Sequence, residues 1–464
     1  MQKDNKIFKI ILVGILFFGI FGLAKSSLAS NANVYVAPAA TGDGSGTDWN
    51  NQAQWSTVAL TRGNIYYLAD GTYGSKTLDT AVSGSTYIYI KKATVSAHGT
   101  DTGWSSTYGD GVATFDTASL TITSDYWDID GVTGGGPGNW KTGFGIAFTS
   151  VAGADLEYIN LDGRSYIFIR HISFVQVGDT TVYNSGASAF YAANPNATIS
   201  NSTFEYLYFN NLGRLPFMFR NGSNNIIQYN YSGDVCGMSV HNPNNHCEVL
   251  VSWGMSQVDF RYNYLDESPS TGGYVMNNLV SVGVRIYGNV FNTGNPISCN
   301  TGSCTDWVIA NNTFVKTGSG PMQGDGTAKN LIMYNNIVFD AITGWIGSYA
   351  WLSRVAGSCS SGADENTNVT VRMPYDCDQY YESLDPFVNS LGHLPKNFLL
   401  TAPLIGWPGT DVCAFDSCNS TKKFNYDMFG RLRGADGVWD RGAIEYVQGG
   451  DKIAPAAPTG LRIE

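Results

Sequence analysis

The stretch Ile227-Gln-Tyr-Asn230-Tyr begins a series of short segments that decides the fold of this chain. In each segment an apolar residue is followed three positions later by asparagine, and then by an aromatic or aliphatic residue. Four later segments repeat the pattern: Phe260-Arg-Tyr-Asn263-Tyr-Leu, Ile286-Tyr-Gly-Asn289-Val-Phe, Ile309-Ala-Asn-Asn312-Thr-Phe and Met333-Tyr-Asn-Asn336-Ile-Val. A sixth segment, Ile199-Ser-Asn201-Ser-Thr-Phe204, carries its asparagine one place early.

The spacing of these asparagines predicts a repeat architecture. From Asn230 onward they are 33, 26, 23 and 24 residues apart, and such periods are typical of units that stack on one another. Alternating apolar and polar residues predict strands at 87–91, 166–170 and 282–287. Three short strands fit one period, whereas a four-stranded propeller blade would need about 40 residues or more. The chain is therefore predicted to be all-β, a parallel β-helix with three sheets and about 8–11 coils.

The repeated asparagine has two structural roles in such a coil. At a sharp bend it tolerates the left-handed backbone conformation. Its side-chain amide also donates to and accepts from the asparagine one coil away, which forms a ladder. We therefore interpret these asparagines as structural.

Residues 1–29 are predicted to be a secretory signal peptide. Three lysines precede the apolar run Ile10–Leu23, and small residues up to Ala29 suit cleavage there. An uncleaved anchor is the alternative, and no later segment is long enough to span a membrane. The segment carries four Lys and one Asp, so its removal takes the net charge from −11 to −14. An exported acidic protein is a poor candidate for nucleic-acid binding.

The exported part divides into four regions by composition. Residues 30–125 form an opening region, 126–345 carry the regular coils, 346–447 are less regular, and 448–464 form a Pro/Ala-rich tail or linker. All eight cysteines lie in the exported part, which suggests disulfides, and pairing between sequence neighbours is the simplest of 105 connectivities. A zinc site is the competing interpretation. The neighbouring pairs are Cys236 and Cys247, Cys299 and Cys304, Cys359 and Cys377, and Cys413 and Cys418.

Two ends of the chain resemble a known superfamily. The start, Tyr35-Val-Ala-Pro38 and Ile65-Tyr-Tyr-Leu-Ala-Asp-Gly71, resembles the opening of secreted right-handed parallel β-helix proteins related to polysaccharide lyases, the pectate-lyase-like superfamily. The stretch Trp439-Asp-Arg-Gly-Ala-Ile-Glu445-Tyr446 is similar to their closing segment. The resemblance covers nearly all of 34–447 and implies a right-handed helix. It matches no characterised subfamily, and this fold carries lyases, hydrolases, epimerases and adhesins.

The resemblance also implies that substrate lies along the sheet that precedes the asparagine-bearing strand. On that sheet we predict that Phe217, Phe219, Val249 and Val251 point inward. The outward set is then Met218, Arg220, Glu248, Leu250 and Ser252. Its predicted segments are Ala187–Tyr191, Leu215–Arg220, Cys247–Ser252, Gly273–Met276, Pro296–Cys299 and Gly320–Gln323.

Titratable residues gather on one part of this sheet. Arg220, His246 and Glu248 are the predicted catalytic residues. A uronic-acid lyase must neutralise a carboxylate, which arginine or a metal ion can do, and must move protons, which histidine can do near neutral pH. The predicted substrate-binding residues are Arg214, His241, Trp253 and Tyr274. The structural alternative is that His246 and Glu248 are solvated or paired residues beside a loop.

Three other functions remain open. A hydrolase would pair Glu248 with a second carboxylate, one of Asp234, Asp266 or Glu267. A shared position in their coils, six or seven residues after the first apolar residue, is occupied by Asp234, Asp266, Asp340 and Lys316. The three carboxylates could therefore bind Ca²⁺ at one edge of a sheet. The alternative is that they are solvated turn residues, and the sequence identifies no other metal. A non-catalytic adhesion protein would use the long sheet only to bind. The expected partner is a polysaccharide or cell-surface glycan, bound by a monomer.

Overall fold

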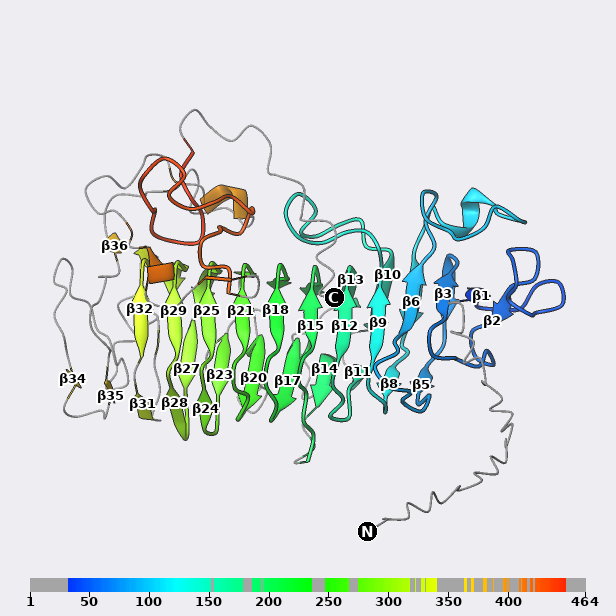
Figure 1. Ribbon diagram of the computed structural model, residues 1–464, viewed down its shortest axis with the longest axis horizontal. Coiled ribbons are helices and arrows are strands. Elements are labelled where there is room, and N and C mark those ends of the chain that lie inside the picture. The colour runs from blue at the N-terminus through cyan, green and yellow to red at the C-terminus, as the bar shows by residue number, and fades with distance from the viewer. Residues whose placement is uncertain are drawn as a thin grey trace, which may run out of the picture.

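The computed structural model describes residues 32–151, 154–177, 186–192, 194, 196–235, 247–266, 274–317, 322, 327–329, 331–339, 363–364, 369–370, 379–381, 387, 395–398, 400, 409, 411–414, 418–419 and 422–447. Three long sheets, all with parallel pairing, run along one axis (Figure 1). The predicted three-sheet parallel β-helix is confirmed. The described residues form no α-helix, and no helix among them is long and apolar enough to cross a membrane.

The strands of each sheet are given in the order in which they pair. Sheet A has 12 strands: β2 (Ala53–Gln54), β1 (Asn33–Ala37), β3 (Ile65–Leu68), β6 (Ile88–Lys92), β9 (Trp127–Asp130), β12 (Ile167–Arg170), β15 (Thr203–Glu205), β18 (Ile226–Gln228), β21 (Asp259–Arg261), β25 (Arg285–Tyr287), β29 (Val308–Ala310) and β32 (Ile332–Tyr334). Sheet B has 11 strands: β4 (Gly71–Tyr73), β7 (Ala113–Asp116), β10 (Ile146–Val151), β13 (Ile172–Val177), β16 (Tyr208–Asn210), β19 (Tyr231–Gly233), β22 (Tyr264–Asp266), β26 (Val290–Gly294), β30 (Thr313–Thr317), β33 (Ile337–Phe339) and β36 (Gln379–Tyr381).

Sheet C has 8 strands: β5 (Lys76–Leu78), β8 (Leu120–Ile122), β11 (Glu157–Asn160), β14 (Ser188–Ala192), β17 (Phe217–Arg220), β20 (Leu250–Trp253), β23 (Val275–Asn277) and β27 (Ile297–Cys299). From β3 to β27 the coils pass through sheets A, B and C in turn. Smaller elements are β24 (Ser281–Val282), β28 (Ser303–Thr305), β31 (Thr327–Lys329), β34 (Ala363–Asp364), β35 (Val369–Thr370) and the 3-10 helices η1 (Ser106–Tyr108), η3 (Pro395–Phe398) and η4 (Val412–Ala414). Coiling begins before residue 126, since β3 to β8 already belong to the three sheets.

The core consists of side chains that stack in register from coil to coil. On sheet B, Phe115, Phe148, Phe174 and Phe209 occupy paired positions. Their ring centroids are 4.7, 5.2 and 5.4 Å apart, and all four rings are buried. Because parallel pairing places like positions above one another, each apolar residue of one coil packs on its counterpart in the next.

The asparagine ladder is present as predicted. Asn230, Asn263, Asn289, Asn312 and Asn336 are buried, and the Nδ2 of each of the first four donates to Oδ1 of the next asparagine at 3.0–3.1 Å. The Nδ2 of Asn336 donates to Ile309 O at 2.9 Å. The same Oδ1 atoms accept from the backbone N–H of the preceding ladder residue at 2.9–3.1 Å. Every amide of the ladder is therefore satisfied inside the protein, at the corner between sheets A and B.

Two details of the predicted asparagine pattern are wrong. The left-handed residue at each corner precedes the ladder asparagine: φ is +55° at Tyr229 and Tyr262, and +66° at Gly288. The bend is thus made one residue earlier, which leaves the asparagine side chain aligned with the ladder. Asn201 is not a ladder member, because Leu207 occupies that place and donates its N–H to Asn230 Oδ1 at 3.0 Å.

Disulfides join Cys299 to Cys304 and Cys413 to Cys418, as predicted. Cys247 is also disulfide-bonded. The predicted partner Cys236, the pair Cys359 and Cys377, the signal peptide and the tail lie outside the described residues.

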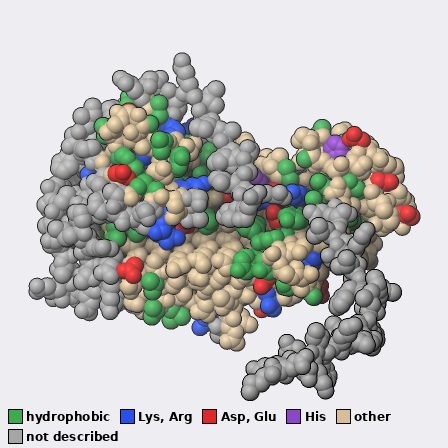
Figure 2. Space-filling view, viewed as in Figure 1, with side chains coloured by type: hydrophobic (Ala, Val, Ile, Leu, Met, Phe, Trp, Pro, Cys, Tyr) green, Lys and Arg blue, Asp and Glu red, His purple; other side chains and the backbone are tan. Residues whose placement is uncertain are grey.

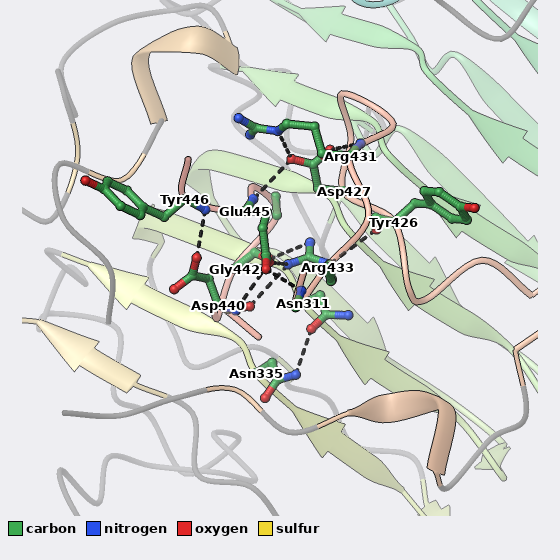
Figure 3. A network of polar contacts seen from close by, with 12 residues as sticks. Asn311, Asn335, Tyr426, Asp427, Arg431, Arg433, Asp440, Gly442, Glu445 and Tyr446 are labelled. Carbon is green, nitrogen blue, oxygen red and sulfur yellow. Dashed lines mark hydrogen bonds and ion pairs between the residues drawn. The ribbon is translucent and has the colours of Figure 1, made fainter. Parts of the chain in front are cut away.

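The closing segment, residues 422–447, packs on the corner between sheets A and B. Asn311 Nδ2 donates to Phe424 O at 3.4 Å, and the Ala443 N–H donates to Thr313 Oγ1 at 2.9 Å. At its centre the buried guanidinium of Arg433 donates to Gly442 O at 2.9 Å and to Glu445 Oε2 at 3.4 Å (Figure 3). The segment also covers two corner tyrosines: the Tyr262 hydroxyl donates to Lys423 O at 2.5 Å, and the ring centroids of Tyr287 and Phe424 are 4.4 Å apart.

Candidate functional site

Sheet C is the sheet that the sequence indicates as the substrate face. β14, β17, β20, β23 and β27 fall within or overlap five of the six predicted segments. Of the sixth, 320–323, the structure describes Met322 alone, which is buried. Sheet C also lies opposite the corner that carries the asparagine ladder, because that corner joins the other two sheets.

The predicted alternation is confirmed on β17 and is wrong on β20. Phe217 and Phe219 are in the core, but Leu250 pairs with Phe217 and also belongs to the core. Val251 pairs with Met218 and joins the outer side chains. The physical reason lies just before the strand, where the N–H groups of Val249 and Leu250 both donate to Tyr274 O at 2.9 Å. Val249 and Leu250 therefore both lie opposite Tyr274, as in a β-bulge, and the alternation of inward and outward side chains shifts by one residue.

The slip brings Trp253 beside Arg220 on the outer face of sheet C. The two residues are paired in the register, and the Arg220 guanidinium carbon lies 5.3 Å from the centroid of the indole ring. Both side chains are half-buried. A guanidinium over an indole face is attracted by the ring's negative potential, which holds the arginine in place. Among the described residues Arg220 has no carboxylate within ion-pair distance.

Apolar side chains support this pair. Leu215, Met218, Val251 and Met276 form a buried cluster on the outer side of the sheet, and Trp253 and Tyr191 pack against it. The outer positions nearer the N-terminal end of sheet C are polar, with Thr77, Thr121 and Asn160 in register with Tyr191. The outer face of sheet C is therefore polar over β5, β8 and β11, and aromatic and cationic over β17 and β20.

Arg214 does not converge with Arg220. It precedes β17, whereas Arg220 ends β17, so about six residues of extended chain, roughly 20 Å, separate them. Arg214 lies instead near Glu157 at the opposite edge of sheet C. Burial raises the pKa of Glu157, and the positive charge of Arg214 acts in the opposite direction. Arg214 can therefore contact a long chain bound on the sheet, at a different place from Arg220.

Two predicted site residues are buried away from the sheet surface, which corrects their predicted exposure. The Glu248 side chain, just before β20, is buried. Tyr274 is also buried: its hydroxyl donates to Asn292 O at 2.8 Å, and its ring packs against Phe291 at 5.8 Å. His241 and His246 lie outside the described residues.

The carboxylates proposed for Ca²⁺ do lie at one edge of sheet B, but they do not form a cation site in the described structure. Asp266 ends β22 and Asp234 follows β19, and the turn places of Asp234 and Lys316 are alike, both with φ of +51°. Asp266 already accepts from the Tyr231 hydroxyl at 2.5 Å and from Asn292 Nδ2 at 2.8 Å. The described residues contain no group of three potential ligands. Asp340 and Glu267 lie outside them.

Arg170 lies at the centre of a charged cluster on the outer face of sheet A. Its Nη2 lies 2.9–3.0 Å from both Asp128 oxygens, and its Nε lies 2.9 Å from Asp130 Oδ2. Figure 2 shows that acidic and basic side chains occur in small groups among other residues on the side of the molecule that it presents. The coil period could have revealed the cluster, since β9 and β12 pair in register. Because its charges are mutually paired, we interpret it as structural.

A pH dependence follows from this cluster. Burial raises the pKa of Asp128 to about 6, although Arg170 opposes the shift. A carboxyl group with a higher pKa in the folded state stabilises the fold at low pH, and this contribution falls as pH rises from about 4 through about 6. In the unaltered protein the free energy of unfolding is expected to fall by about 1–3 kcal/mol over this pH range because of Asp128. The Asp128→Asn variant is expected to lack this fall. Urea unfolding at several pH values tests this, with the exposed Asp79→Asn as control; an unchanged pH slope in Asp128→Asn would contradict it.

Comparison with known proteins gives a likeness of architecture. No family model and no curated protein matches the chain. Among solved structures it is similar to pectate lyase Pel9A, at 15% identity and a TM-score of 0.46, over 91% of this chain and 98% of that one. It is also similar to the GH136 lacto-N-biosidase from Eubacterium ramulus, at 12% identity and a TM-score of 0.37, over 66% of this chain and 64% of that one. At these values neither likeness carries an argument about activity.

Proposed function

We propose that this protein is an exported β-helix that binds an extracellular uronic-acid polysaccharide along sheet C and cleaves it by β-elimination. The observation that supports this proposal is the Arg220–Trp253 pair. An aromatic face stacks on sugar rings, and a positioned guanidinium forms two parallel hydrogen bonds to a carboxylate. Since no described carboxylate pairs with Arg220, its charge is available to a sugar carboxylate.

The roles of individual residues follow from the chemistry of β-elimination. Arg220 neutralises the carboxylate and so makes the neighbouring C5 proton more acidic. A base takes this proton, the C5–H electron pair forms the C4–C5 double bond, and the C4–O bond breaks as its oxygen receives a proton. His246 is the sequence-based candidate for the proton transfers. Arg214 and Trp253 extend the binding face, while Glu248 and Tyr274, being buried, are assigned positioning roles behind it.

The test measures the absorbance of the unsaturated product with pectate, alginate and glycosaminoglycans, each with and without Ca²⁺. Arg220→Ala is expected to lower kcat/KM about 100-fold or more on the reactive polymer, and Arg220→Lys by less, because lysine keeps the charge but loses the bidentate geometry. His246→Ala is expected to abolish turnover. Arg164→Ala, which removes an arginine paired with Asp162 at 3.7 Å, is the matched control.

The alternatives give different outcomes in the same experiment. New reducing ends without unsaturated product would indicate a hydrolase with paired carboxylates. Binding by calorimetry without any product would indicate an adhesion protein. If no polymer is bound or cleaved, the proposed function is wrong.

A further inference from the structure

The corner between sheets A and B is interrupted in two successive coils. In later coils this corner consists of two residues, as at 229–230 and 262–263. Between β6 and β7 it is replaced by residues 93–112, and between β9 and β10 by residues 131–145. Figure 1 shows both loops above the sheets, in cyan. Long loops in a compact domain are uncommon, and those that occur are usually functional.

The two loops line a cavity of about 400 Å³ that is open to solvent. Ligand sites typically have volumes of about 300–1,000 Å³, so this cavity has the size of a small-molecule site. Both loops and the end of β6 line it: Lys92, Thr94, Val95, Ser96, Gly109, Asp110, Gly111, Val112, Thr133, Gly143, Phe144 and Gly145.

The cavity walls are held in place by buried polar contacts. The Lys92 ammonium lies 2.6 Å from Asp70 Oδ1 and donates to Tyr108 O at 3.2 Å. The other Asp70 oxygen accepts from the Gly111 N–H at 2.6 Å. On the second loop, Thr133 Oγ1 donates to Gly143 O at 2.8 Å. The cavity is therefore preformed, which lowers the entropic cost of binding.

The lining indicates which ligands fit. The Lys92 ammonium is buried and engaged by Asp70 and backbone carbonyls, so it offers no free positive charge. The remaining groups are the Thr94 and Ser96 hydroxyls, the exposed Asp110 carboxylate, glycine backbone and the Phe144 ring. This set accepts and donates hydrogen bonds, gives apolar contact to one side and disfavours anions.

We propose that this corner cavity binds a neutral sugar residue. It lies on the corner opposite sheet C, so it is separate from the face proposed for uronic-acid polymers, and it stands whether or not that proposal holds. A polysaccharide with neutral branches or ends would thereby contact the protein at two places. Among the described residues, the cavity groups and the Arg220–Trp253 pair share no side chain.

The experiment uses the full-length exported protein and saturation-transfer NMR with galactose, glucose, xylose and N-acetylglucosamine as probes. At least one sugar is expected to bind saturably. Asp110→Asn is expected to weaken that binding about tenfold, because it removes a charged hydrogen-bond acceptor. Ser96→Tyr, which fills the cavity, is expected to abolish it. Trp253→Ala is expected to leave it unchanged.

Matched controls lie on the same loop. Asp101→Asn and Ser106→Tyr alter exposed residues outside the cavity lining and are expected to bind as the unaltered protein does. Thermal unfolding verifies that each variant is folded. The proposal is overturned if no neutral sugar binds, if the cavity variants bind normally, or if Trp253→Ala removes the binding. A failure of lyase activity with sugar binding intact would reject only the function proposed for sheet C.

Discussion

Asn289→Ala is expected to lower the free energy of unfolding by about 3–5 kcal/mol. Asn289 lies within the ladder: its Oδ1 accepts from Asn263 N and Nδ2 at 2.9 and 3.1 Å, and its Nδ2 donates to Phe260 O and Asn312 Oδ1 at 2.9 and 3.0 Å. Alanine leaves several of these buried groups unpaired, and each costs about 1–3 kcal/mol. Urea unfolding measures the loss, and hydrogen exchange shows whether it extends to adjacent coils.

Two further variants sharpen this prediction. Asn289→Asp keeps an acceptor for Asn263 but loses the donor and buries a charge, so its stability is expected to increase at low pH, where the carboxyl group is protonated. Asn139→Ala changes an exposed asparagine and is expected to alter stability by less than about 0.5 kcal/mol. A loss below about 1 kcal/mol in Asn289→Ala would show that the ladder is dispensable.

Arg433→Ala is expected to release the closing segment, residues 422–447, from the coils. The Arg433 guanidinium donates to three backbone carbonyls, of Tyr426, Asp440 and Gly442, and pairs with Glu445. Burial raises the pKa of Glu445 to about 7 while Arg433 opposes that shift, so removing the cation leaves a buried carboxylate without its partner. Breaking one side of a buried pair costs about 3–5 kcal/mol.

Hydrogen exchange locates this effect. Exchange is expected to accelerate in the closing segment and around Thr313 on β30, because the Thr313 hydroxyl accepts from the Ala443 N–H. Exchange in sheet C is expected to stay unchanged. Replacing Arg433 and Glu445 together by methionine is expected to restore part of the loss, since neither member of the pair is then left as a buried charge without its partner. Uniform acceleration along the whole helix would instead indicate that the segment is needed for global stability.

The architecture follows from residue types that recur at regular intervals along the chain. The asparagine spacing and the alternating strands predicted three parallel sheets and the ladder at Asn230 to Asn336, and the structure confirms both. The pairing of cysteines that are neighbours in the sequence predicted the Cys299–Cys304 and Cys413–Cys418 disulfides, which are also confirmed. Such features are readable from the sequence because each coil packs mainly on its neighbours, so the same residue type recurs at the same place.

The surface available to a ligand depends instead on contacts that the repeated residue pattern does not predict. One carbonyl, of Tyr274, accepts from both Val249 and Leu250, and this slip brings Trp253 beside Arg220 on the outer face. Likewise, loops 93–112 and 131–145 line an open cavity because two insertions fall at one corner of adjacent coils. The strand period predicts where a side chain lies only while the alternation is unbroken. Bulges and insertions break it, and their effect is set by residues far apart in sequence that the coil brings together.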